Sequence, residues 1–273
     1  MNYQVHFKEN LYFTIKLIAA IVGYVAIAAL LVFVASKGSA KLVAFVPIIC
    51  YVGIFLLYLV FRHGILIGYL KGNAVRVSDN QFPALYGIAK THAERLGLSR
   101  IPSIYVLQAG GLLNAFATRF FGKDFVVIYS DILETAYEQG NKALEFVVAH
   151  EFGHIKRRHS TKHVLLFPSF FVPFLNAAYS RACEYTCDRI GYALCPEGST
   201  GMLVLAGGKN LHSKISVDAF LQNSQAERGF WRWFAEIVSS HPNLPKRISQ
   251  LRHLSGRSGS QAQWESERST NNG

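Results

Sequence analysis

Two long apolar runs near the N-terminus constrain the fold of this chain more than any other feature. Leu11 to Ser36 is apolar throughout except for Lys16, and a second run begins at Leu42 and continues to Phe61. A helix that crosses a bilayer needs about 20 apolar residues, and each run is long enough. A cleaved signal peptide is the alternative for the first run, and a buried core helix for the second. The lengths of the runs and the short loop between them predict two transmembrane helices within residues 11–70, after a tail of residues 1–10.

Basic residues beside the two runs predict their orientation. Lys8 and Lys16 lie at the start of the first run, and Arg62, Lys71 and Arg76 follow the second run. The loop between the runs contains Lys37 and Lys41. Cytoplasmic flanks of membrane helices carry the excess of Lys and Arg. We therefore expect an inner or plasma membrane protein whose remaining chain faces the cytoplasm.

The formal net charge of +11 raises the question of nucleic-acid binding. The Lys and Arg residues are scattered, and several flank apolar segments, as in His159 to Lys162. Attraction to anionic lipid headgroups, about 1 kcal/mol per basic residue near the surface, accounts for this pattern. The four cysteines form no disulfide framework, in agreement with a reducing compartment. The chain is predicted to contact a lipid bilayer and no nucleic acid.

A five-residue motif, His150-Glu151-Phe152-Gly153-His154, carries the chemistry. Side chains four positions apart lie on the same face of a helix, so both histidines can bind one ion. Glu151 can then act on a water molecule beside the metal. This H-E-x-x-H pattern is typical of zinc proteases. The residues around it have helical apolar spacing, which supports the required helix; a buried helix with two structural histidines is the alternative.

Glu184 is the candidate third ligand. Glu184 and Asp188 are four residues apart and share one helical face. Two histidines and a glutamate leave one zinc position open for water, which is the catalytic arrangement. Asp188 would orient a ligand imidazole through its other N–H. A solvated acidic face paired with Arg181 or Arg189 is the alternative.

Cys183 and Cys187 provide a rival set of ligands. They are also four residues apart, and as thiolates they could hold zinc in a closed structural site. Glu184 is preferred because Glu151 would have no role at a closed site.

Short strand-like runs precede the motif helix. They cover Ser103 to Leu107, Leu112 to Thr118 and Phe125 to Ser130, after a helix expected to start at Ser78-Asp79. We expect a mainly α fold, a zincin-like α+β catalytic domain over residues 71–254 with a small antiparallel β-sheet beside the motif helix. The tail, residues 255–273, is rich in Ser, Gly, Gln and Asn and is predicted to be disordered.

The apolar stretch from Val164 to Tyr179 does not qualify as a third span. It is short and contains Pro168 and Pro173. A single crossing here would also put His154 and Glu184 on opposite sides of the membrane. A core, re-entrant or interfacial position remains open for it.

With these motifs in order, the sequence resembles the integral-membrane zinc endopeptidases typified by HtpX and by the type I CAAX prenyl protease. The resemblance runs from about Ser78 to Leu254. Its motifs are Asn114-Ala115-Phe116-Ala117, His150 to His154, Glu184 with Asp188, and Ser240-His241-Pro242 with Arg247-Ile248.

The resemblance implies one zinc ion on His150, His154 and Glu184, with Glu151 as general base. It implies that Asn114, Ala115, Phe116 and Ala117 form an edge strand that pairs with the substrate backbone. It also implies that His241 stabilises the transition state or product, and that Arg247 is an ion-pair partner near the site. HtpX-like members have further spans where this chain has only Val164 to Tyr179, so prenylated substrates do not follow.

Together these features predict a membrane-anchored zinc metalloendopeptidase that cleaves proteins or peptides, membrane proteins among them, in membrane-protein quality control. A signalling protease that cleaves one regulator is an alternative. A non-catalytic scaffold stabilised by zinc is another, but it would have no need of Glu151.

Overall fold

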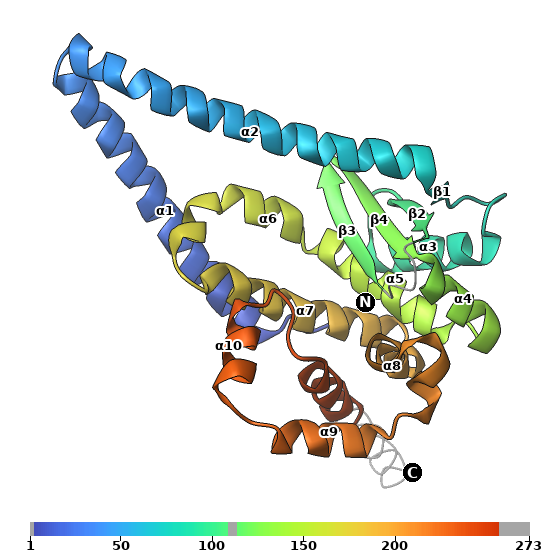
Figure 1. Ribbon diagram of the computed structural model, residues 1–273. Coiled ribbons are helices and arrows are strands. Elements are labelled where there is room, and N and C mark those ends of the chain that lie inside the picture. The colour runs from blue at the N-terminus through green and yellow to red at the C-terminus, as the bar shows by residue number, and fades with distance from the viewer. Residues whose placement is uncertain (1–2, 109–113, 257–273) are drawn as a thin grey trace, which may run out of the picture.

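The computed structural model describes residues 3–108 and 114–256 (Figure 1). The expected start of a strand at Leu112 and most of the expected disordered tail, residues 257–273, lie outside the described residues. Within them the fold is mainly helical with one small sheet, as the sequence predicts.

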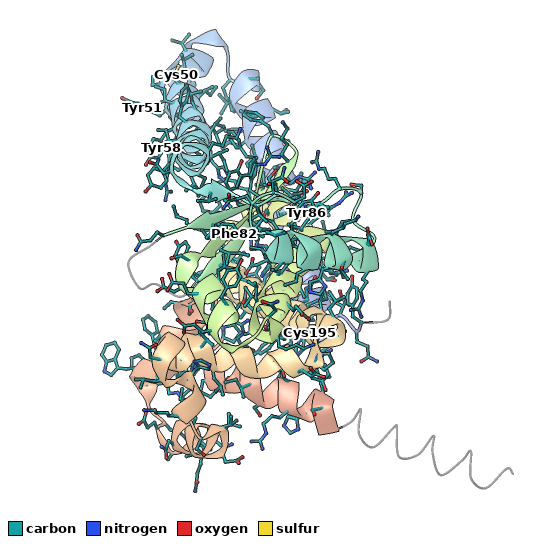
Figure 2. All side chains as sticks on the ribbon, turned by 90° about the vertical axis from the view of Figure 1, so that its right-hand side faces the viewer. Cys50, Tyr51, Tyr58, Phe82, Tyr86 and Cys195 are labelled. Carbon is teal, nitrogen blue, oxygen red and sulfur yellow. The ribbon has the colours of Figure 1, made fainter. Side chains whose placement is uncertain are left out.

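The two apolar runs form a long helical hairpin that projects from the rest of the molecule (Figure 1). Helix α1 covers Phe7–Ser36 and α2 covers Ser39–Asn73. By length and composition, Phe7–Ser36 and Phe45–Asn73 could each cross a membrane, and only 11% and 0% of their most apolar stretches are buried. A core helix would be mostly buried. Figure 2 shows Cys50, Tyr51 and Tyr58 on the stretch of α2 that extends away from the body.

The sheet has four strands in the order β1-β2-β4-β3. They are β1 (Val75–Arg76), β2 (Ser103–Leu107), β3 (Ala115–Phe120) and β4 (Lys123–Tyr129). It is mixed rather than purely antiparallel, because β4 lies between β2 and β3 and runs parallel to β2. A tight hairpin joins β3 to β4 through Phe121 and Gly122, which both have positive φ (43° and 74°). This order leaves β3 at an edge.

Successive side chains along the strands point to opposite faces of the sheet, and both faces are apolar. One face packs into the main core with helices α3 (Pro83–Leu96), α5 (Lys142–Lys156) and α7 (Leu175–Leu194). On the other face, Tyr105 and Val127 pack against Ile67 and Leu70 of α2. The end of α2 therefore anchors the hairpin to the sheet.

Helix α3 begins five residues later than expected. Ser78 pairs with Gln81 in an isolated bridge, and Asp79 accepts a hydrogen bond from the Asn80 N–H. The helix starts only at Pro83, whose fixed φ suits a first helical position. The expectation of a start at Ser78-Asp79 was wrong because these residues make a turn instead.

The other helices connect and cover this framework. They are α4 (Ser130–Gln139), α6 (His159–Leu165), η1 (Phe167–Phe171), η2 (Pro196–Leu203), α8 (Val204–Leu211), η3 (His212–Lys214), α9 (Val217–Ala226), α10 (Phe230–Val238) and helical residues 244–256.

Helices α5 and α7 pack unusually close together, and glycines make this contact possible. A Cβ atom added at Gly153 would lie 3.1 Å from Sγ of Cys187, and one added at Gly191 would lie 2.9 Å from the Phe146 ring. The second distance is shorter than packing allows and the first is tighter than most contacts, so a larger residue at either position would displace its neighbour. The close approach brings the histidine face of α5 against the acidic face of α7.

The stretch between α6 and α7 packs on α1. A Cβ at Gly23 would clash with Pro168, and the Tyr24 hydroxyl donates to the Leu165 carbonyl oxygen (3.0 Å). Phe170 and Phe171 remain exposed. Pro168 and Ser169 are buried, so the segment has one packed and one exposed side, and it lies beside a helix long and apolar enough to span a bilayer.

Candidate active site

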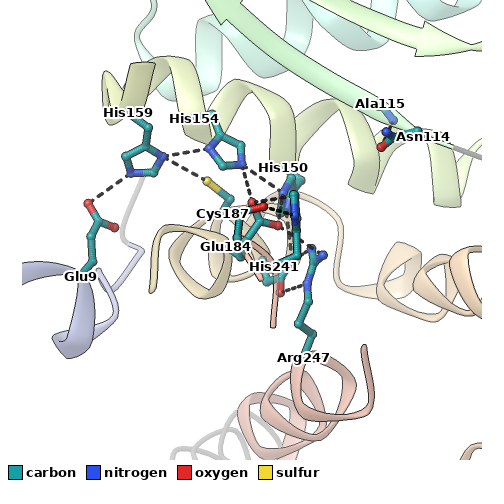
Figure 3. Close-up of polar contacts among 12 residues, drawn as sticks. Glu9, Asn114, Ala115, His150, His154, His159, Glu184, Cys187, His241 and Arg247 are labelled. Carbon is teal, nitrogen blue, oxygen red and sulfur yellow. Dashed lines mark hydrogen bonds and ion pairs between the residues drawn. The ribbon is translucent and has the colours of Figure 1, made fainter. Parts of the chain in front are cut away.

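Three nitrogen and oxygen donors converge between α5 and α7 (Figure 3). The Nε2 atoms of His150 and His154 are 3.3 Å apart. A carboxylate oxygen of Glu184 lies 3.5 Å from the first and the other lies 3.3 Å from the second. The helical spacing of the motif on α5 and the position of Glu184 on α7 thus bring together the three ligands expected from the sequence.

The spacing of these donors fits a zinc ion. Ligands about 2.0–2.1 Å from zinc in tetrahedral geometry lie about 3.3 Å from one another. The distance between the histidine nitrogens, and the distance of each from a different Glu184 oxygen, are within a few tenths of an ångström of that value. Two imidazole nitrogens facing each other at this distance need a proton or a cation between them, and a divalent metal would satisfy all three donors.

The charges around the site also favour a cation. Burial alone would raise the pKa of Glu184, but Arg247 and hydrogen bonds from His150 and His154 lower it well below its ordinary value. Burial opposes a charge on His150 as well, yet its contacts with Asp188 and Glu184 raise its pKa to about 10. The carboxylates that hold this proton on His150 would also attract a metal ion, and binding of the metal would release the proton.

Asp188 and Arg247 lie directly behind the ligands. Oδ1 of Asp188 is 2.9 Å from Nδ1 of His150, so the carboxylate holds the ring with Nε2 directed at the other donors. Arg247 donates to both oxygens of Asp188, and its Nη1 lies 3.3 Å from Glu184. Both side chains therefore contact donor residues of the site, and their roles there remain predictions.

Cys187 is the remaining rival as a ligand. Among the described residues, His150, His154 and Cys187 offer atoms within 4.8 Å of one another, so this set could also hold a metal. Burial, followed by the negative charge of Glu184, raises the pKa of the Cys187 thiol well above its ordinary value. Glu184 supplies an anionic donor 3.3 Å from His154, and Cys187 lies in the packed contact with Gly153.

Glu151 and the edge strand line one cavity of about 420 Å³ with the three donors. Glu151 is buried but reaches the cavity wall, as does β3 through Ala115, Phe116 and Ala117. Asn114 precedes β3, and its side chain accepts a hydrogen bond from the Ala115 N–H (2.9 Å). The cavity is large enough for a few residues of an extended peptide.

His241 stands at the mouth of this cavity. Its side chain is 65% exposed, and its Nε2 lies 3.6 Å from Glu184. The Ser240 hydroxyl is 2.9 Å from its Nδ1. Its exposed position on the cavity lining lets it reach a bound substrate.

Two residues that the sequence analysis did not connect with the site lie close behind His154. Nδ1 of His159 is 3.0 Å from Nδ1 of His154, and Nε2 of His159 is 3.3 Å from Glu9 (Figure 3). The position of His159 five residues after His154 was a signal for this contact. Nothing in the sequence links Glu9, which lies 145 positions before His154, to the site.

Comparison with known proteins identifies the family and a similar fold. The sequence model of Peptidase family M48 matches residues 79–176 and 163–255, more than half of the chain. No curated protein matches significantly. The crystal structure of S. mikatae Ste24p is similar in fold, with a TM-score of 0.51 and 14% identity, over 91% of this chain and 67% of that chain.

Proposed function

The chain belongs to peptidase family M48, and we propose that His150, His154 and Glu184 hold its catalytic zinc while Glu151 acts as the general base. One observation carries this assignment. The two histidine Nε2 atoms lie 3.3 Å apart and each lies 3.3–3.5 Å from one Glu184 oxygen, in a cavity that they share with Glu151 and with β3, an edge strand of the described sheet. Membership of the family makes the protein a metalloendopeptidase acting on peptides or proteins. The proposal assigns the zinc ligands and the general base to particular residues.

Zinc, when bound, acts as a Lewis acid that acidifies water and polarises the scissile carbonyl. Glu151 takes a proton from the attacking water and passes it to the leaving amine nitrogen. His241 reaches over the site from its exposed position and donates to the oxygen that becomes negative in the transition state. Asp188 fixes the orientation of His150, and Arg247 balances the charge of the two carboxylates.

The substrate backbone would pair with β3. The Tyr129 N–H donates to the Asn114 carbonyl oxygen, so Asn114 directs its carbonyl toward β4. Ala115 and Ala117 lie at the positions between those that bond to β4. In an antiparallel pair, alternate residues turn their N–H and C=O groups away from the neighbouring strand. The backbone of Ala115 and Ala117 therefore faces the free edge, and an extended peptide can add there as a further strand.

The domain over residues 71–254 would be held at a membrane surface by α1 and α2. The basic residues beside the helix ends favour its location in the cytoplasm, at an inner or plasma membrane. A cleft held at that surface suits chains that enter or leave the bilayer, which supports a role in membrane-protein quality control. A signalling protease with one substrate would have the same site, and a zinc-stabilised scaffold would not require Glu151.

The test is a Glu151→Gln variant of the full-length protein, with Glu145→Gln as control. Glu145 lies on the same helix but does not line the cavity. We expect Glu151→Gln to retain zinc by elemental analysis and to lose at least about 100-fold in casein cleavage. The control should keep both properties. Near wild-type cleavage by Glu151→Gln would refute the general-base assignment.

The same variant addresses the biological role. An inactive enzyme that still binds its substrates retains them, and mass spectrometry identifies them. Many unrelated membrane proteins would support quality control, whereas one dominant protein would favour signalling.

A further inference from the structure

A line of polar contacts connects the first apolar helix to His154 (Figure 3). Nδ1 of His154 is 3.0 Å from Nδ1 of His159, and Nε2 of His159 is 3.3 Å from Oε1 of Glu9. Glu9 belongs to the first turns of α1, and it is only 1% exposed. A buried carboxylate at the start of a helix that could span a membrane thus lies two contacts from a zinc ligand.

Only one placement of protons lets His154 bind metal through Nε2. That nitrogen must then offer its lone pair, so the proton of the neutral ring is on Nδ1. The Nδ1–H faces Nδ1 of His159, which must accept it. His159 therefore carries its own proton on Nε2, where the Glu9 carboxylate accepts it. Each of the three groups fixes the tautomer of the next.

The cluster does not have the charges of a second metal site. Glu9, His159 and Cys183 offer atoms within 4.8 Å of one another. However, Arg157 donates to Oε1 of Glu9 through Nε (3.0 Å) and Nη2 (2.9 Å), and Nζ of Lys162 lies 3.8 Å from the same oxygen. Two cations already neutralise this carboxylate, so an added metal ion would be repelled.

We propose that Glu9 and His159 are positioning residues that hold the His154 imidazole in its metal-binding tautomer and orientation. The inference rests on the proposed zinc site and extends it into the membrane anchor. Such outer hydrogen bonds commonly contribute 10–100-fold to metal affinity. The start of α1 therefore contributes to the zinc site, and docking of α1 on α6 and α7 raises its metal affinity.

The test measures the zinc dissociation constant of the full-length protein in detergent by chelator competition. His159→Phe removes the acceptor for His154, whereas His159→Asn keeps an acceptor oxygen near the position of Nδ1. His163→Phe is the matched control, since His163 lies one turn further on α6 and its Nδ1 contacts Asn176 instead. Glu9→Gln removes the charge but keeps an oxygen, and Lys8→Gln at the neighbouring exposed position is its control.

We expect His159→Phe to weaken zinc binding by about 10–100-fold and Glu9→Gln by about tenfold, with His159→Asn close to wild type. In the cobalt-substituted protein, His159→Phe should also shift the visible absorption bands that report ligand geometry. Wild-type affinity and an unchanged cobalt spectrum in His159→Phe would overturn the proposal. His159→Asn keeps the proposal testable if His159→Phe fails to fold. If His159→Asn weakens zinc binding as much as loss of the ligand itself in His154→Ala, the proposal is contradicted.

A Glu184→Ala variant separates this failure from failure of the zinc site itself. If Glu184→Ala binds zinc normally, the ligand assignment is wrong. If Glu184→Ala loses zinc while His159→Phe does not, the site stands and only the positioning role is wrong.

Discussion

Arg247 and Asp188 form a bidentate ion pair in the interior, with Nε of Arg247 2.8 Å from Oδ2 of Asp188 and Nη2 2.6 Å from Oδ1. Both side chains are buried. The third guanidinium nitrogen, Nη1, lies 3.3 Å from Glu184. One arginine from helical residues 244–256 therefore balances two carboxylates of α7, and it ties the C-terminal part of the chain to the metal site.

Removing Arg247 should destabilise the metal-free protein strongly. Arg247→Met leaves Asp188 and Glu184 buried without their cation, and breaking a buried pair costs about 3–5 kcal/mol. The matched control is Arg252→Met on the same helix. Arg252 pairs with Asp218 at the surface, where an ion pair contributes at most about 1 kcal/mol. Urea unfolding followed by near-UV circular dichroism measures both, and equal losses would contradict the buried role of Arg247.

The stability of the metal-free protein should fall on both sides of neutral pH. Burial alone would raise the pKa of Asp188, but Arg247 lowers it below the ordinary value of 3.8. Its contribution is therefore complete above about pH 4 and is lost as the pH falls through the lower pKa of the folded state. His150 acts in the opposite direction. Its pKa rises from 6.5 to about 10, so its contribution is complete below about pH 6.5 and disappears as the pH approaches 10.

Melting temperatures measured between pH 3 and 10 would show a maximum near neutral pH. In Arg247→Met the acid limb should move to higher pH, because Asp188 no longer has the guanidinium that lowers its pKa. Zinc should flatten the alkaline limb, since the metal replaces the proton on His150. A flat profile in the metal-free wild type would contradict these shifts.

The sequence allowed prediction of those parts of the site that depend on local periodicity. Two histidines four apart share one face of their helix, and a glutamate and an aspartate four apart share one face of another, whatever the rest of the fold does. The position of β4 between β2 and β3 could not be predicted, because hydrophobic alternation does not specify which strands pair. The contact of Glu9 with His159 was also hidden, since it depends on α1 docking against α6 and α7. A charged residue before an apolar run looks like an ordinary membrane flank.

Glu184 should matter to zinc far more than the two cysteines. Glu184→Ala removes a donor 3.3–3.5 Å from both imidazole nitrogens, and we expect zinc affinity to fall by more than about 100-fold, beyond the usual effect of outer contacts. The double variant Cys183→Ser, Cys187→Ser should stay within about tenfold of wild type. Elemental analysis after dialysis against a chelator measures both. Loss of metal from the cysteine variant alone would make the site structural, and the proposed mechanism would fail with it.

The free edge of β3 predicts a selective effect of proline. Proline at Ala117 removes an N–H that faces the edge, whereas proline at Phe116 removes one directed at β4. Ala117→Pro should lower kcat/KM by about tenfold, the effect of one lost hydrogen bond of about 1.4 kcal/mol, with little change in melting temperature. Phe116→Pro should instead lower the melting temperature. If Ala117→Pro cleaves a peptide as well as wild type, the substrate does not add to this edge.

The final prediction concerns residues 164–174, whose position relates the membrane to the catalytic cleft. Gly23 lies seven residues beyond Lys16 on α1, about 10 Å along the helix, and Pro168 packs against it. The segment therefore reaches into the apolar zone beside α1, and Phe171, 76% exposed, faces outward there. Because His154 and Glu184 share one site, the segment must return to the side from which it entered.

Single cysteines in a Cys50→Ser background test this path, since the other three native cysteines are buried. A membrane-impermeant maleimide should label cysteines at Arg158 and Ser180 from the same side of sealed vesicles, and a cysteine at Lys37 from the opposite side. A cysteine at Phe171 should react only after detergent is added, because lipid covers it. The unsubstituted background should stay unlabelled.

Labelling of positions 158 and 180 from opposite sides would prove a true crossing, which is incompatible with one zinc ion bound by both His154 and Glu184. Free labelling at position 171 would place the segment in water, and the catalytic cleft would then stand clear of the bilayer.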